Sequence, residues 1–181
     1  MISQKMEKEI NSQITREMYS AYLYMSISAN ASRDGLKGIA TWFMVQYHEE
    51  MVHAMKMYEY IIRQGGRVVL DVIQKPPSSW KSPLEMFENA LEHEKTVTKN
   101  INNLLDLAVS EKDHASQTFF HWYVTEQIEE EDNATDITQK LRLIGDNAGA
   151  LYLLDKELGA RMLTVPSDFS KGVEAQMGAA A

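Results

Sequence analysis

The stretch that decides the fold is His48-Glu49-Glu50-Met51-Val52-His53-Ala54, in which a carboxylate and an imidazole interrupt an apolar helical seam. Steps of three and four residues through the surrounding sequence give the seam Ile39, Phe43, Gln46, Glu50, His53, Met57 and Tyr60. Residues three apart lie on one helix face, so Glu50 and His53 point the same way. A buried carboxylate is costly unless it is paired or binds a metal. This seam therefore predicts a metal site in a helical core.

Three further segments with helical periodicity carry the same kind of interruption. The polar residues on their apolar seams are Glu17, Glu94 and the pair Gln127 and Glu130. Counted from the predicted turns at 1.5 Å per residue, all four positions lie at the same height within about one helical turn. Four helices that each bury such a group at mid-length predict one shared site.

The helix boundaries follow from proline, glycine and capping signals. Ser82-Pro83-Leu84-Glu85 offers an N-cap serine, a proline at the first helical position and a glutamate at N3. Gly35 and the pair Gly65–Gly66 are stop signals. The sequence predicts long helices over residues 3–34, from there to 64, over 83–112 and over 113–145. A short fifth helix follows at 148–158, with Leu151, Leu154 and Leu158 on one face.

The connections predict the topology. The two short turns make two antiparallel hairpins. The link at 65–81 is long: some 16 extended residues reach at most about 55 Å, whereas a helix of ~27 residues is about 40 Å long. The link contains Val68, Val69, Leu70, Val72 and Ile73, which favours extended, partly packed chain. We expect an all-α four-helix bundle with one long crossover between the second and third helices.

Composition restricts the class of protein further. The 181 residues suit a single domain, which we place at 1–160. A net charge of -8 argues against nucleic-acid binding, and no apolar run is long enough for a membrane span. The absence of cysteine excludes disulfides and thiolate ligands, and with no signal-like start it favours the cytoplasm. The tail at 161–181 contains Pro166 and ends in Gly-Ala-Ala-Ala, a composition that fits disorder as readily as structure.

The donor set selects the metal. It comprises four carboxylates and one imidazole, from Glu17, Glu50, His53, Glu94 and Glu130. Such ligands suit iron or manganese and are poor for soft copper. With Glu50 as a bridge, the set is large enough for two ions. A single glutamate on a seam is usually a solvated edge position, but four matched positions are much harder to reach by chance.

Four motifs resemble the non-haem ferritins of bacteria and archaea, over about residues 3–160. They are Arg16-Glu17-Met18-Tyr19-Ser20-Ala21-Tyr22-Leu23-Tyr24, the stretch at 48–54, Glu92-His93-Glu94, and Trp122-Tyr123-Val124-Thr125-Glu126-Gln127-Ile128-Glu129-Glu130-Glu131. The resemblance implies a ferritin-like bundle and an iron storage protein with ferroxidase activity. It implies that Fe(II) is oxidised by O₂ or H₂O₂ and stored as a ferric mineral. It further implies that the partner is the chain itself, in a hollow homo-oligomer that usually has 24 subunits.

The resemblance also implies roles for single residues. Glu17, Glu50 and His53 correspond to ligands of a first iron, and Glu50, Glu94 and Glu130 to ligands of a second. Gln127 corresponds to a hydrogen-bonding residue at the site, and Tyr24 to a neighbouring hydrogen-bond donor and electron donor. Glu49, Glu126 and Glu129, which share Glu130, match a third iron site. For these last acids the alternative is a solvated acidic face.

The ligand pattern on the fourth predicted helix differs from that of related ferritin variants. The second Glu-x-x-His of bacterioferritin is replaced here by Gln127-x-x-Glu130, so no haem is expected, and Met51 is assigned to packing. The complete ligand set within one chain argues against the DNA-coating miniferritins. One rival is a di-iron oxidase or peroxidase-type enzyme in the same bundle. The other is a metal-free structural bundle, which would leave the polar seam residues without a purpose.

Overall fold

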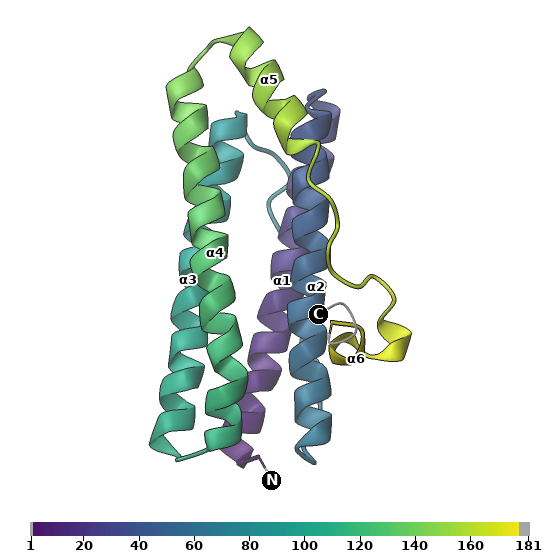
Figure 1. Cartoon of the computed structure of the whole chain (residues 1–181), viewed down its shortest axis with the longest axis vertical. Helices are drawn as coiled ribbons and strands as arrows, with labels where there is room; N and C mark the ends of the chain where they lie inside the picture. The colour runs from purple at the N-terminus through teal and green to yellow at the C-terminus, as the bar shows by residue number, and fades with distance from the viewer. Residues whose placement is uncertain (1, 178–181) are drawn as a thin grey trace. The chain divides into compact units, whose positions relative to one another are not determined.

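All regular structure in residues 2–177, the part of the chain that the computed structural model describes, is helical (Figure 1). The elements are α1 (Gln4–Arg33), α2 (Lys37–Arg63), α3 (Pro83–Ser110), α4 (His114–Ile144), α5 (Ala148–Leu158), the 3₁₀ turn η1 (Phe169–Lys171) and α6 (Val173–Met177). The chain forms two compact units. The first comprises residues 2–79 and 152–177 of the described part, and the second is Trp80–Leu151. No described helix is both long enough and apolar enough to cross a membrane.

In the first unit, α1 and α2 form a helical hairpin. The Ser3 side chain caps α1 by accepting a 3.0 Å hydrogen bond from the backbone N–H of Met6. Gly35 has a φ of +81° in the turn between the two helices, a left-handed conformation that favours glycine. Fully buried apolar side chains on these helices include Ile10, Ile14, Ile27, Phe43 and Met57. The bounds of both helices lie close to the predicted ones.

The link that follows α2 is fastened to α1 by side chains. The Asn11 amide donates to the carbonyl of Arg67 and accepts from the N–H of Val69, at 2.9 and 2.7 Å. Further along, the Ser26 hydroxyl donates to the carbonyl of Pro77 at 2.6 Å. The apolar side chains of Val69 and Leu70 are exposed. The link is therefore held through its own backbone groups, which bond to side chains of α1.

The C-terminal part of the first unit lies along α2. Asp155 of α5 accepts a 2.8 Å hydrogen bond from the N–H of Ile39 at the start of α2. The chain then descends beside α2 in Figure 1, and α6 packs against α2. Residues 169–177 of the predicted tail thus form η1 and α6, whereas the prediction for 178–181 falls outside the described residues. The domain boundary at 160 stays a prediction.

The second unit contains the α3–α4 hairpin. Ser82 caps α3 by accepting from the N–H of Glu85 at 3.2 Å, and Asp113 caps α4 by accepting from the N–H of Ser116 at 3.1 Å. The Ser82 cap is as predicted, and Asp113 stands at the predicted start of α4. Helix α3 ends at Ser110, two residues before the predicted end, because Lys112 adopts a φ of +57° that terminates the helix.

Candidate metal centre

Three predicted ligands in the first unit meet in the core. One ligand atom from each of Glu17, Glu50 and His53 lies within 4.8 Å of the others. Their exposed fractions are 1%, 1% and 4%. Within residues 2–177, they form the one group of three or more acidic, histidine or cysteine side chains that meets this spacing. Two carboxylates and an imidazole at such distances offer a cation three ligand atoms in a dry site.

One carboxylate oxygen of Glu17 accepts a hydrogen bond, and the other has no hydrogen-bond donor among the described residues. The buried Gln13 donates to Glu17 Oε1 at 2.8 Å, and Arg16 donates to the Oε1 atom of Gln13 at 3.0 Å. Glu17 Oε2 is buried and has no hydrogen-bond partner among the described residues. A buried acceptor without a donor is unfavourable, and a bound cation would satisfy it. The residues present therefore fit a metal ion.

The second unit contributes Glu94 on α3, and Gln127 and Glu130 on α4, which are 2%, 3% and 7% exposed. The Nε2 atom of Gln127 lies 3.1 Å from Glu94 Oε2 and 3.3 Å from the Glu94 backbone oxygen. Because the amide donates to both, it fixes the orientation of the Glu94 carboxylate. Gln127 is therefore a positioning residue for Glu94.

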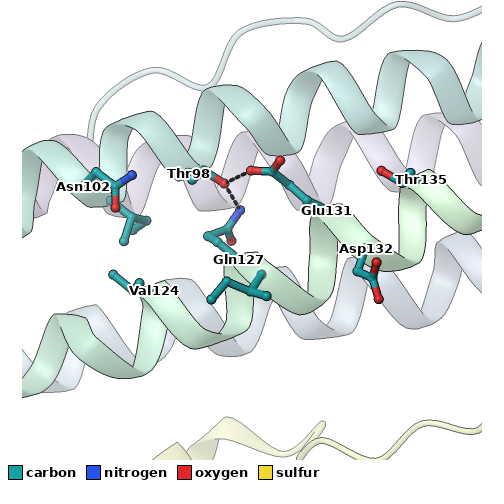
Figure 2. A pocket seen from close by; sticks show the side chains of 9 residues that line it. Thr98, Asn102, Val124, Gln127, Glu131, Asp132 and Thr135 are labelled. Carbon is teal, nitrogen blue, oxygen red and sulfur yellow. Dashed lines mark hydrogen bonds between the residues drawn. The ribbon is translucent and has the colours of Figure 1, made fainter.

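A chain of hydrogen bonds leads from Gln127 toward a pocket on the α3–α4 hairpin. Gln127 also donates to the Thr98 hydroxyl at 3.3 Å, and that hydroxyl donates to Glu131 at 2.5 Å (Figure 2). The pocket has a volume of about 640 Å³, and its lining includes Asn102 and Asp132 as well as these three residues. Glu94 is thus connected to a surface pocket through fixed polar side chains.

The remaining predicted residues occupy different surroundings. Tyr24 is fully buried on α1, with its ring centroid 5.8 Å from that of Phe43. Glu126 is half-buried and Glu129 is exposed, both on α4. His93, next to Glu94, has its pKa lowered to about 4 by burial, so its imidazole is neutral at neutral pH. The roles predicted for Tyr24, Glu126 and Glu129 stay predictions.

Glu49 has a partner that the sequence did not reveal. Arg161 donates from Nη2 to Glu49 Oε2 at 2.5 Å, and its Cζ lies 4.6 Å from the ring centroid of Trp42. Burial raises the pKa of Glu49, and the neighbouring Arg161 guanidinium and His53 partly offset this. The predicted third-site ligand is therefore engaged by a guanidinium.

Other supporting residues also escaped sequence reasoning, for different reasons. Gln13 lies four residues before Glu17, a spacing that places both on one face, so this contact was accessible from the sequence. Thr98 lies on the predicted seam but carries no charge that marks it. Arg161 is 112 residues from Glu49, and no periodicity connects the two.

Fold and site together define a class: helical proteins whose buried carboxylates and imidazole have the spacing to hold a metal ion. The family model for a ferritin-like domain matches residues 7–144. The chain therefore belongs to the ferritin family. The predicted all-α, ferritin-like fold is confirmed by this match and by solved structures of ferritins.

Known relatives cover most of the chain. A bacterial non-heme ferritin of Bacteroides fragilis is 44% identical over 161 residues, which span 89% of this chain and 100% of the relative. A probable bacterial non-heme ferritin-like protein of Haemophilus influenzae is 38% identical over 159 residues, covering 88% and 96%. An Archaeoglobus fulgidus ferritin engineered to a closed form is 51% identical, with a TM-score of 0.90 over 91% of this chain and 100% of that chain. These relatives support a role in iron storage.

Proposed function

We propose that this protein stores iron and is a ferroxidase: it oxidises Fe(II) at a dinuclear centre and keeps the product as a ferric mineral in a hollow shell. The group of Glu17, Glu50 and His53 carries the proposal. Its buried, closely spaced donors include the Glu17 oxygen that has no partner among the described residues. In a chain of the ferritin family, the natural cation for this group is the substrate Fe(II).

The proposed centre draws its ligands from the four seams that the sequence predicts. Glu17, Glu50 and His53 bind one Fe(II), and Glu94 and Glu130 bind a second, with Glu50 shared. Counted along the helices from the predicted turns, these residues lie at the same level within about one turn, which supports this pairing. The burial of all five side chains supports it too, as does the family model, whose match at residues 7–144 includes all five. No haem has a role in the proposed centre.

The protein residues set up the oxidation of the substrate. When two Fe(II) ions are bound, they supply two electrons to O₂, which takes up two protons and leaves as H₂O₂. The carboxylates favour this change because they stabilise the higher charge of Fe(III) more strongly than that of Fe(II). Gln13 and Gln127 hold Glu17 and Glu94 in place, so little reorganisation is needed when charge develops. Tyr24 is proposed as a hydrogen-bond donor and electron donor beside the centre.

Glu49, Glu126 and Glu129 are proposed to bind a third iron together with Glu130. Replacing Glu126 and Glu129 together by alanine should shift the ratio of iron oxidised to O₂ consumed within its limits of two (H₂O₂ as product) and four (water as product), or change the turnover rate severalfold. Initial Fe(II) binding should persist, because the dinuclear ligands remain. Stopped-flow oxidation with an oxygen electrode measures both quantities.

The matched control for the third site is Asp136→Ala, which removes an exposed acid of the same helix that pairs with Lys140. If the double variant matches this control in stoichiometry and turnover, Glu126 and Glu129 are a solvated acidic face.

Assembly separates a storage protein from a di-iron enzyme of the same fold. We expect native mass spectrometry to detect a closed homo-oligomer, with a mass of about 490 kDa if 24 copies of the 20.6 kDa chain combine. The same particles should gain mass on aerobic addition of Fe(II), because mineral accumulates inside them. A stable dimer that assembles no further, and gains no iron beyond a few ions per chain, would rule out storage. Such a shell is expected in the cytoplasm.

A further inference from the structure

The segment between α5 and α6 is fixed to α2 through residues of the helices that flank it. At the start, Asp155 accepts from the N–H of Ile39 at 2.8 Å. At the far end, the N–H of Val173 donates to Glu59 at 2.6 Å, and Glu174 pairs with Arg63 at 2.5 Å. Val173 is fully buried. The chain between these anchors is therefore constrained to follow α2.

Arg161 lies in this constrained segment, and two groups of α2 hold it. Its guanidinium packs over the Trp42 ring, and its Nη2 bonds to Glu49. The exposed fractions of the Arg161 and Glu49 side chains are 21% and 14%, so water and salt screen this pair much less than a surface ion pair. A charge-assisted bond in such surroundings is strong and directional.

We propose that Arg161 is an internal cation that occupies the Glu49 carboxylate and that metal must displace or outcompete. This rests on the proposed function, in which Glu49 is a ligand of the third iron. A carboxylate oxygen that accepts from a guanidinium is a weaker donor to a metal, and the two positive charges repel each other. Arg161 thereby keeps the affinity of this position low, so that iron bound at Glu49 is easily released.

The test is Zn(II) binding to the assembled, iron-free protein by titration calorimetry and equilibrium dialysis, because Zn(II) undergoes no redox chemistry. Arg161→Gln should bind Zn(II) at its weaker class of sites about tenfold more tightly than the parent protein. Arg161→Lys keeps the charge and should stay close to the parent. Lys156→Gln, a matched control, removes an exposed positive charge of α5 and should change nothing.

The source of the gain is identified by a second substitution. Adding Glu49→Gln to Arg161→Gln should abolish the tenfold gain, because the liberated carboxylate is then absent. Unchanged affinity in Arg161→Gln, or a gain that persists without Glu49, would overturn the proposal. If Arg161→Gln fails to fold, Arg161→Met keeps the side-chain stem on Trp42 and carries the same expectation.

Failure of the proposed metal centre has its own signature. Glu50→Ala should lose the tightest Zn(II) sites, whatever residue stands at position 161. If Glu50→Ala retains them, the dinuclear centre is wrong. If those sites are lost as expected but Arg161→Gln is unaffected, only the role of Arg161 is wrong.

Discussion

Glu50→Ala is expected to abolish rapid aerobic oxidation of Fe(II), with a loss of about a hundredfold or more, because losing an inner ligand exceeds the 10- to 100-fold cost of losing a supporting residue. Glu50 contributes to the group of three in the first unit, where its Oε2 lies 3.6 Å from His53 Nδ1. It is also the ligand proposed to be shared between the two Fe(II) ions. The substitution thus weakens both halves of the centre.

The helical fold should survive this substitution. Without metal, Glu17 and Glu50 place two carboxyl groups close together in a buried site, and the substitution removes one of these buried polar groups. The melting temperature of the metal-free variant should therefore be equal to that of the parent or higher. Stopped-flow absorbance of the ferric product measures the rate, and circular dichroism measures the melting temperature. Glu88→Ala, an exposed acid of α3 that pairs with Arg142, is the matched control. Oxidation kinetics identical to the parent would show that Glu50 is not a ligand.

Gly38→Ala is expected to lower the free energy of unfolding by about 3 kcal/mol, the upper end of the usual cost of overpacking, or to detach α5 from α2. A Cβ atom at position 38 would lie 1.6 Å from the backbone oxygen of Asp155 and 2.5 Å from its carbonyl carbon. These are backbone atoms, which cannot rotate away as a side chain can. The two helices must separate, and the bond from Ile39 to Asp155 is then lost.

Gly149→Ala provides the control for Gly38→Ala. A Cβ at position 149 meets only the end of the Asn147 side chain, at 3.4 Å, and alanine is the better helix former. This control should be neutral or slightly stabilising. Thermal denaturation together with hydrogen exchange of the α5 amides distinguishes global destabilisation from local detachment. If Gly38→Ala melts and exchanges like the parent, the close approach of α2 and α5 does not contribute to stability.

The helices could be predicted from local chemistry, and the early end of α3 at Ser110 has a physical cause. Ser82 caps α3 as its Ser-Pro-Leu-Glu start signal predicted, and Ser3 and Asp113 cap α1 and α4 at the predicted starts of those helices. The end of α3 carries no glycine, so its position was not visible in the sequence. There the N–H groups of Lys112 and Asp113 bond back to the carbonyls of Val109 and Ala108. A lysine thus takes the left-handed conformation that usually favours glycine.

The site was predictable to the extent that helical periodicity determines it. Glu17, Glu50 and His53 were found from their spacing on two seams, and the structure places them together. Contacts between residues far apart in sequence, such as Arg161 with Glu49, depend on the path of irregular chain. No repeat or propensity encodes that path. The acids were therefore predictable from the sequence, whereas the cation that engages one of them was not.

The link after α2 has almost no slack. Its attachment points on α1, Asn11 and Ser26, are about 22 Å apart at 1.5 Å per residue. The eight steps from Val69 to Pro77 reach about 26–29 Å when extended. The connection is consequently tolerant of insertion and intolerant of deletion. An added residue only bulges outward, whereas removing two or more would break an anchor, so length variation among homologues should be one-sided here.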